Sequence, residues 1–303
     1  MTPGGASKRG SHRLSESALC PRKWSFHNAM GLKPKTTPDY FMEGTLIHIV
    51  LAYHYAGKLA QPPSWYYDIP LEAALLKTGK GHPKAIELAK ECGAAYADYY
   101  SSHDPWEPVA IEEEYVARVG DLRRMVDPFC ADHPADNEYV TSRIDLVMRI
   151  NGYIWHADYK TTLHGKGKLN VLNDDGEYAI YWQFLVQTLI LKHHFGLDYR
   201  GMLVQRIYRR EPFDFDRAVV RMPPLPLRDA ATVIADRCMA EHRIATEARA
   251  AAAAGKDMEV WMPSGNYWNC FSWGKPCEYR QLCTAENDPM LREVMTREFM
   301  VGE

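Results

Sequence analysis

The spacing of apolar residues divides the chain into helix-type and strand-type segments. Apolar positions at intervals of three and four predict helices, whereas strict alternation predicts strands. The predicted helices span 14–31, 42–57, 84–101, 178–196 and 227–255, and the predicted strands span 107–120, 138–150, 153–162, 199–210 and 213–222. This order predicts an α/β fold in which a small mixed β-sheet is flanked by helices, with helical additions before and after it.

The segment 153–162, YIWHADYKTT, has charged residues where a strand should fill a core. Side chains of a strand alternate between its two faces, so His156, Asp158 and Lys160 share one face and Ala157 lies on the other. An Asn-Gly pair precedes this segment and is typical of a tight hairpin turn. The hairpin therefore predicts that the strand before the turn lies directly beside Asp158 and Lys160.

The strand before the turn carries a second carboxylate, Asp145, in SRIDLVMRI. Alternation places Asp145 on one face with Val147 and places Ile144 and Leu146 on the other. Two carboxylates and a lysine can then converge at one spot on the sheet. Mg²⁺ and Mn²⁺ prefer oxygen ligands, and a neighbouring lysine can orient or deprotonate a water that attacks a phosphate. The alternative is a salt bridge on an exposed face of the sheet.

Bulk composition narrows the class of protein. The chain has 303 residues, 46% of them hydrophobic, and a formal net charge of −3. A polyanion site must therefore be a local patch. The polar start and the interrupted apolar stretches predict no secretory signal and no membrane span, and so a cytoplasmic protein. We expect a disordered segment at 1–13, one domain over 14–289 and a tail at 290–303.

The seven cysteines are unevenly distributed. An odd number in a chain without an export signal argues against a disulfide framework. Three of them are crowded near the end of the sequence, in NCFSWGKPCEYRQLC, and form a Cys-rich C-terminal segment.

The RID and DYKTT motifs together resemble the core of the PD-(D/E)XK nuclease superfamily, in its RecB-like branch. GTLIHIVL resembles the helix of that branch that carries a Gly and a metal-ligating His, here Gly44 and His48. The resemblance implies that Mg²⁺ or Mn²⁺ is bound and that Lys160 serves the attacking water. The implied metal ligands are His48, Asp145, Asp158 and the main-chain carbonyl of Tyr159.

Two further side chains belong to this expected site. YWQFLVQTLIL resembles the helix that follows the active strands in the family and points to Gln183, which otherwise faces solvent. The sequence departs from the family at Gln187, where a Tyr is usual. Glu113 interrupts the apolar alternation of 107–120, so it either points to the metal site or is an edge-strand charge.

LSESALCPRKW resembles the N-terminal helix of members that carry an iron–sulfur cluster, such as AddB-type subunits, CRISPR-associated RecB-like exonucleases and phage relatives. The resemblance implies a [4Fe–4S] cluster held by Cys20, Cys270, Cys277 and Cys283, although four thiolates suit structural Zn²⁺ equally well. The gap between Cys270 and Cys277 is wider than the usual C-x-x-C.

The resemblance implies a divalent-metal-dependent DNA nuclease, an exonuclease acting on DNA ends or single strands in recombination, repair, phage or CRISPR DNA processing. Partner proteins of recombination, CRISPR integration or phage replication are expected. The alternative is a non-catalytic DNA-binding or scaffolding subunit of a nuclease–helicase or integration complex. Phosphate contacts are expected from Lys166, Lys168, Arg206, Arg209 and Arg210, which otherwise are solvated charges.

Overall fold

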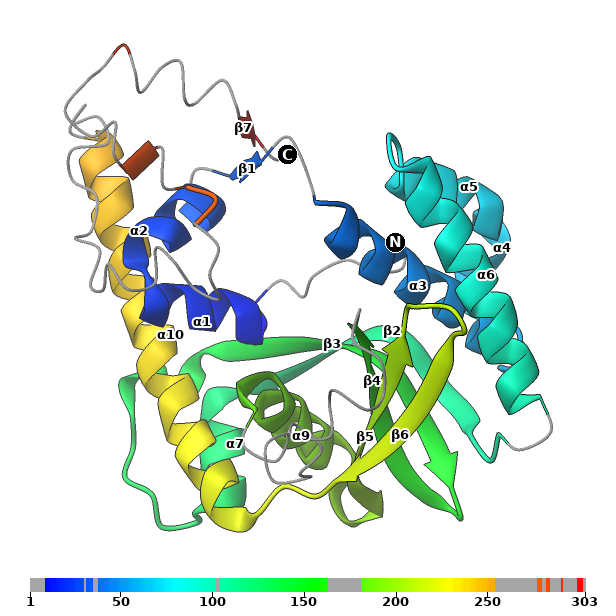
Figure 1. Ribbon diagram of the computed structural model, residues 1–303. Coiled ribbons are helices and arrows are strands. Elements are labelled where there is room, and N and C mark those ends of the chain that lie inside the picture. Colours follow the sequence, from blue (N-terminus) through cyan, green and yellow to red (C-terminus); the bar gives the residue numbers. More distant parts are fainter. Residues whose placement is uncertain are drawn as a thin grey trace.

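A mixed five-stranded sheet forms the centre of the molecule (Figure 1). The computed structural model describes residues 9–29, 31–34, 38–101, 104–162, 181–253, 277–279, 282–283, 290 and 299–301. The strands of the sheet, in spatial order, are β2 (Glu107–Arg118), β3 (Tyr139–Ile150), β4 (Tyr153–Thr162), β5 (Tyr199–Tyr208) and β6 (Asp214–Val220). Only β4 and β5 pair in parallel, and the other neighbours in this sheet are antiparallel.

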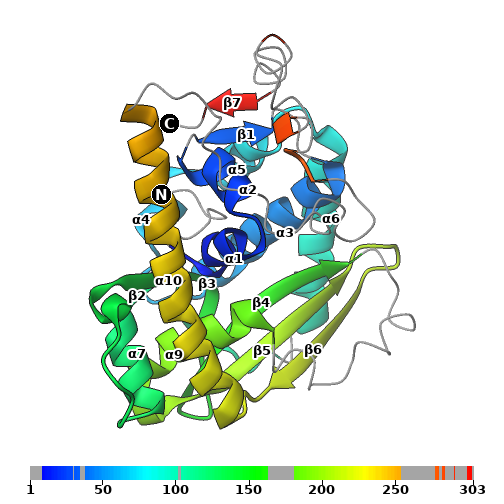
Figure 2. The same ribbon diagram turned by 90° about the vertical axis from the view of Figure 1, so that its left-hand side faces the viewer.

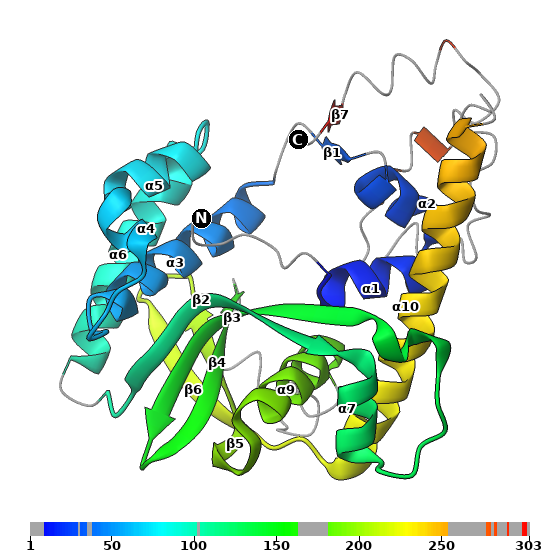
Figure 3. The same ribbon diagram turned by 180° about the vertical axis from the view of Figure 1, so that it is seen from behind.

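Helices cover both faces of the sheet, as Figures 1 and 3 show from opposite sides. The helices on one face are α3 (Asp39–Ala56), α4 (Ser64–Asp68), α5 (Leu71–Thr78) and α6 (Pro83–Tyr100). Those packed against the other face are α7 (Val119–Val126), α9 (Trp182–Phe195) and α10 (Pro224–Ala253). Because both faces are covered, β3 and β5 are buried along most of their length, and β4 is buried at 154 and 156–159.

The predicted α/β fold with a small mixed sheet is confirmed. The hairpin turn between β3 and β4 follows the prediction, since Asn151 and Gly152 have φ values of 51° and 82°, as a type I′ turn requires. Among the described residues, the structure adds three short α-helices that the apolar pattern did not reveal. These are α4 and α5 in the expected connection after α3, and α7 directly after β2.

The first predicted helix, 14–31, is interrupted at Cys20. The chain forms α1 (Ser11–Leu19), α2 (Pro21–Trp24) and a π-helical turn (Ser25–Ala29). Cys20 has an extended backbone, with φ −155° and ψ 97°, because the ring of a following proline disfavours the helical conformation of the residue before it. The Cys20 thiol then caps α2 by accepting the backbone N–H of Lys23.

Helix α1 lies beside the long helix α10 in Figure 2. It begins at Ser11, inside the segment 1–13 for which we expected disorder. Arg9 and Arg13 both pair with Glu241, which is 3% exposed on α10. These ion pairs hold the first described residues and α1 against α10.

Two short strands, β1 (Leu32–Pro34) and β7 (Phe299–Val301), form a separate antiparallel ladder. It joins residues near the two ends of the chain. Among the described residues, no helix has both the length and the apolar character needed to cross a membrane.

Candidate active site

Strand β4 presents different chemistry on its two faces. Ala157 and Tyr159 pack into the core beneath α3. Ile154 packs into the core beneath α9. Asp158, four residues later on the same face, accepts a hydrogen bond from Gln183 of α9. The sequence alternation therefore predicts the faces of this strand correctly, although both faces are covered by helices.

Asp158 and Lys160 form a polar cluster with two glutamines of α9. The ammonium nitrogen of Lys160 lies 2.6 Å from Oδ2 of Asp158, and the Asp158 side chain is only 2% exposed. Gln183 donates from Nε2 to Oδ1 of Asp158 at 2.8 Å and accepts from Lys160 through Oε1 at 3.2 Å. Gln187, one turn later, also donates to Oδ1 of Asp158, at 3.3 Å. Buried carboxylates need such partners, and here each carboxylate oxygen has one.

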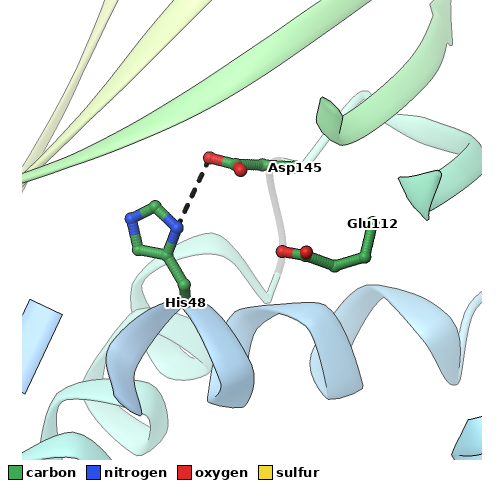
Figure 4. A group of neighbouring side chains, drawn as sticks. All are labelled: His48, Glu112 and Asp145. Carbon is green, nitrogen blue, oxygen red and sulfur yellow. Dashed lines mark ion pairs between the residues drawn. The ribbon is translucent and has the colours of Figure 1, made fainter. Parts of the chain in front are cut away.

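Asp145 lies on the other side of the Tyr159 peptide. Its Oδ2 accepts the backbone N–H of Tyr159 at 2.9 Å. His48 of α3 approaches the same peptide, with Nε2 3.0 Å from the Tyr159 carbonyl oxygen and Nδ1 3.5 Å from Oδ2 of Asp145. Figure 4 shows the imidazole and the carboxylate facing each other.

A third potential metal ligand, Glu112 of β2, joins this pair. One ligand atom each from His48, Glu112 and Asp145 lies within 4.8 Å of the others, and the three side chains converge in Figure 4. A histidine nitrogen and two carboxylates are a suitable donor set for Mn²⁺, and the carboxylates suit Mg²⁺. The residues present therefore fit a divalent cation.

A change of face in two strands explains this convergence. In β3, Ile144 packs beneath α9 whereas Leu146 packs beneath α3, although alternation would place them on the same face. In β2, Ile111 packs beneath α3 and Tyr115 beneath α9. The two changes of face lie opposite each other, because Ile111 pairs with Leu146.

Glu112 lies at the point where β2 changes face, and its backbone has φ 52°. This left-handed conformation is uncommon for a residue with a side chain outside turns, and where it occurs it often marks a functional site. The structure therefore brings Glu112 to the acidic group, whereas Glu113, the residue that we expected there, is exposed. Because the face change shifts the alternation by one residue, the Glu113 side chain points away from the acidic group and is exposed.

The charges of the two clusters influence one another. Burial raises the pKa of Asp145, with the negative charge of Asp158 adding to the effect and the His48 imidazole opposing it. Burial alone would lower the pKa of Lys160, but the ion pair with Asp158 outweighs it, and the pKa is raised. A bound cation would relieve the repulsion between the two buried carboxylates.

Gly44 lets α3 approach the end of β4. A Cβ at Gly44 would lie 2.9 Å from Oγ1 of Thr161, which is closer than real Cβ contacts. The absence of a side chain therefore helps α3 to lie where His48, four residues later, reaches the Tyr159 carbonyl.

The family model of the PD-(D/E)XK nuclease superfamily matches residues 11–284. The chain belongs to the PD-(D/E)XK nuclease superfamily. The match covers the sheet, the acidic group and the Lys160 cluster. Membership of this superfamily accounts for a lysine and acidic residues on neighbouring strands, and it makes a nuclease the expected class of enzyme.

Comparison with solved structures gives distant similarities. A protein described as a "putative exonuclease" from Eubacterium rectale shares 12% identity, over 78% of this chain and 81% of that chain, with a TM-score of 0.46. The solved structure of SSO0001 shares 11% identity, over 80% of this chain and 85% of that chain, with a TM-score of 0.33. No curated protein matches the sequence.

Three of the four cysteines expected to hold a cluster are described, and Cys270 lies outside the described residues. Burial raises the pKa of the Cys283 thiol to about 11, and the nearby Cys20 and Cys277 thiols raise it further. Around these thiols, Phe26 stacks on Tyr279 with ring centroids 5.6 Å apart. The C-terminal cysteines therefore lie against the segment that follows Cys20.

The expected phosphate contacts have mixed placements. Lys166 and Lys168 lie outside the described residues. Arg206 and Arg209 are buried and form ion pairs with Asp216 and Glu43, respectively, so they are not open to solvent as a phosphate contact requires. Arg210 is exposed. Arg206 and Arg209, expected as phosphate contacts or solvated charges, are instead buried in ion pairs with Asp216 and Glu43.

Proposed function

We propose that this protein is a Mg²⁺- or Mn²⁺-dependent deoxyribonuclease of the RecB-like type, and an exonuclease. The observation that carries the proposal is the position of the Tyr159 peptide. The His48–Glu112–Asp145 group contacts this peptide from one side. The paired residues Asp158 and Lys160 are the neighbours of Tyr159 along β4. A cation site and a lysine ammonium therefore flank the same short stretch of backbone.

In this mechanism His48, Glu112 and Asp145 would hold the cation, with the Tyr159 carbonyl and Asp158 as further oxygen donors. A bound cation would polarise the scissile phosphate and lower the pKa of a coordinated water. Lys160 would orient the attacking water and offset negative charge on the phosphate. Gln183 keeps the ammonium in place, because its amide bridges Lys160 and Asp158.

Part of the Lys160 side chain, 34%, is exposed. The rings of Tyr181 and Phe184 lie 5.8 Å and 5.0 Å from its ammonium nitrogen. These contacts restrict the lysine while leaving its head accessible to a substrate. The arrangement supports an active site over a scaffolding role, since a scaffold has no need of a buried carboxylate paired with an accessible lysine.

We further propose a [4Fe–4S] cluster at Cys20, Cys270, Cys277 and Cys283, with Zn²⁺ as the alternative metal. The proximity of Cys20 to Cys277 and Cys283 supports it. Recombination, CRISPR-integration or phage-replication proteins are the partners that we propose for a nuclease of this type.

The direct test is cleavage of DNA. Purified protein is incubated with end-labelled single- and double-stranded DNA in Mg²⁺, in Mn²⁺ or in EDTA. We expect shortening from an end in the presence of either cation and none in EDTA. Intact DNA under all conditions, with binding retained, would instead favour the scaffolding role.

The pair Glu112 and Glu113 provides a matched test of the metal site. Glu112→Gln should weaken Mn²⁺ binding by about tenfold or more, since it removes one charged ligand from the group. Glu113→Gln makes the same chemical change one residue away and should leave the affinity within about twofold.

Isothermal titration calorimetry with Mn²⁺ alone measures both affinities, and the cation dependence of cleavage gives a second measure. Equal losses in the two variants would contradict the assignment of Glu112. A loss confined to Glu113→Gln would restore the expectation from the alternation of the sequence.

A further inference from the structure

Tyr181 is an exposed aromatic residue directly beside the Lys160 ammonium. It is the residue that precedes the first turn of α9, and it is 48% exposed. The ammonium nitrogen of Lys160 lies over the Tyr181 ring, 5.8 Å from its centroid, which is within the range of a cation–π contact. The same ammonium also binds Asp158 and Gln183. The exposed ring therefore offers aromatic surface to a substrate that binds at Lys160.

The start of α9 holds this ring in place. Phe184 is 0% exposed and contacts the Tyr181 ring, with the two ring centroids 5.0 Å apart. The indole N–H of Trp182 donates to the carbonyl of Ser11 at 3.2 Å, and the guanidinium of Arg237 lies 3.9 Å from the indole ring. A ring that is positioned before the substrate arrives loses little conformational freedom on binding.

A nucleotide of DNA fits this combination of groups. An ammonium attracts a phosphate, and an aromatic ring stacks on any of the four bases, because every base has a π-face. A nucleotide carries its phosphate and its base close together, so a phosphate at Lys160 brings the adjoining base to Tyr181. In a duplex the faces of the bases are covered by their neighbours, whereas an unpaired base can be splayed out onto an aromatic side chain.

We propose that Tyr181 is a substrate-binding residue of the nuclease site and stacks on an unpaired nucleobase next to the scissile phosphate. The inference rests on the proposed function and specifies its substrate as a single strand or an unpaired DNA end. Lys160 serves the phosphate, and Tyr181 holds the adjoining base. The two side chains together therefore select nucleotides that have left the duplex.

Tyr181→Leu tests the stack from the side of the protein. It should raise the KM for single-stranded DNA by about tenfold, which corresponds to about 1.4 kcal/mol and lies within the usual contribution of a base–aromatic stack. Single-turnover kcat should stay within about threefold, because Asp158 and Gln183 still hold the lysine. Tyr181→Phe should keep the wild-type KM within about twofold, since the ring and not the hydroxyl makes the stack.

Abasic substitution of the DNA tests the stack from the side of the substrate. A single abasic nucleotide is moved position by position along an end-labelled single strand, and the cut at each phosphate is measured. In the wild-type protein, an abasic nucleotide adjoining the scissile phosphate should lower kcat/KM for that cut by about tenfold. In Tyr181→Leu the same substitution should change it by less than about twofold, because the missing base has no ring left to stack on.

Tyr153→Leu is the matched control. Tyr153 is 43% exposed and also has a cation over its ring, the guanidinium of Arg200 at 4.0 Å. It lies at the other end of β4, seven residues from Lys160, which is about 23 Å along an extended strand. The aromatic–cation arrangement is similar, but it is remote from the site. This control should therefore leave both the KM and the abasic profile unchanged.

The outcomes separate this inference from the function beneath it. A wild-type protein that does not cleave DNA overturns both. A wild type that cleaves, but with a flat abasic profile, overturns the stacking alone. Equal losses in Tyr181→Leu on intact and abasic strands overturn it as well, because Tyr181 would then act only by restricting Lys160. Should Tyr181→Leu fail to fold, the abasic profile of the wild-type protein decides.

Discussion

Replacing Lys160 with Met should reduce DNA cleavage by at least about 10²–10³-fold, the usual cost of losing a group that stabilises charge in a transition state. Met keeps the packing of the side-chain stem against Tyr181 and Phe184 and removes the ammonium. Asp158→Asn should have a similar effect, because it retains an oxygen that can accept from Gln183 but loses the charge.

Either change leaves one member of a close ion pair without its partner. Asp158 is 2% exposed, so an unpaired carboxylate there could destabilise the fold by about 3–5 kcal/mol. Thermal unfolding must therefore accompany the rate measurement. Lys160→Arg keeps the charge and serves as the variant that folds, and it should still cleave slowly, because a planar guanidinium cannot replace the compact ammonium.

Single-turnover cleavage of end-labelled DNA at saturating Mn²⁺ gives the rates, and fluorescence anisotropy gives the DNA affinity. Lys192→Met is the matched control, an exposed lysine on α9. We expect the site variants to bind DNA and fail to cut it. A folded Lys160→Met protein with the wild-type rate would remove Lys160 from the mechanism.

Alternation within a strand was sufficient to predict half of this site. It placed Asp158 and Lys160 on one face of β4, and the Asn-Gly turn placed β3 beside them. Both features depend on local sequence. The helix spacing of Gln183 and Gln187 was also visible, but that both amides point at Asp158 depends on how α9 packs against β4.

The position of Glu112 could not be predicted in this way. Three consecutive glutamates give no local signal for a left-handed residue, and alternation assumes that a strand keeps its faces. The face change in β2 is matched by one in β3, so it is a property of the paired strands. The one available clue was that Asp145, a charged residue, shared its expected face with Val147.

Ion pairs between residues far apart in the sequence could not be predicted either. Arg209 pairs with Glu43 and Arg206 with Asp216, so residues that looked like solvated charges are buried. By contrast, the interruption of the helix at Cys20 has a local cause in the sequence, the following Pro21. The effect of that break is to hold Cys20 between two helices, where its thiol caps the second.

The Cys20 segment carries the second large expected effect, the loss of bound iron in Cys277→Ala. The aromatic ring of Tyr279 stacks on Phe26, and its hydroxyl donates to the carbonyl of Leu32 at 2.7 Å. These contacts hold the C-terminal cysteines against the start of the chain. A metal cluster there would close a loop of about 250 residues, whose closure is entropically costly.

Anaerobically purified protein should be brown and contain about four iron atoms per chain. Cys277→Ala should lose the colour and most of the iron, and limited proteolysis should then cut faster between residues 255 and 265. The free energy of metal binding contributes to folding at such sites, so the thermal unfolding temperature should also fall. Some cleavage of DNA should survive, because His48, Asp145 and Lys160 come from other elements.

Cys238→Ala is the matched control, since Cys238 is a buried thiol within α10 and packs among apolar residues. It should keep the full iron content and colour. Inductively coupled plasma mass spectrometry counts the metal in each variant. One zinc per colourless chain, lost in Cys277→Ala alone, would retain the site and replace the iron. Neither metal in the wild-type protein would contradict the cluster and leave Phe26 and Tyr279 to hold the two segments together by packing alone.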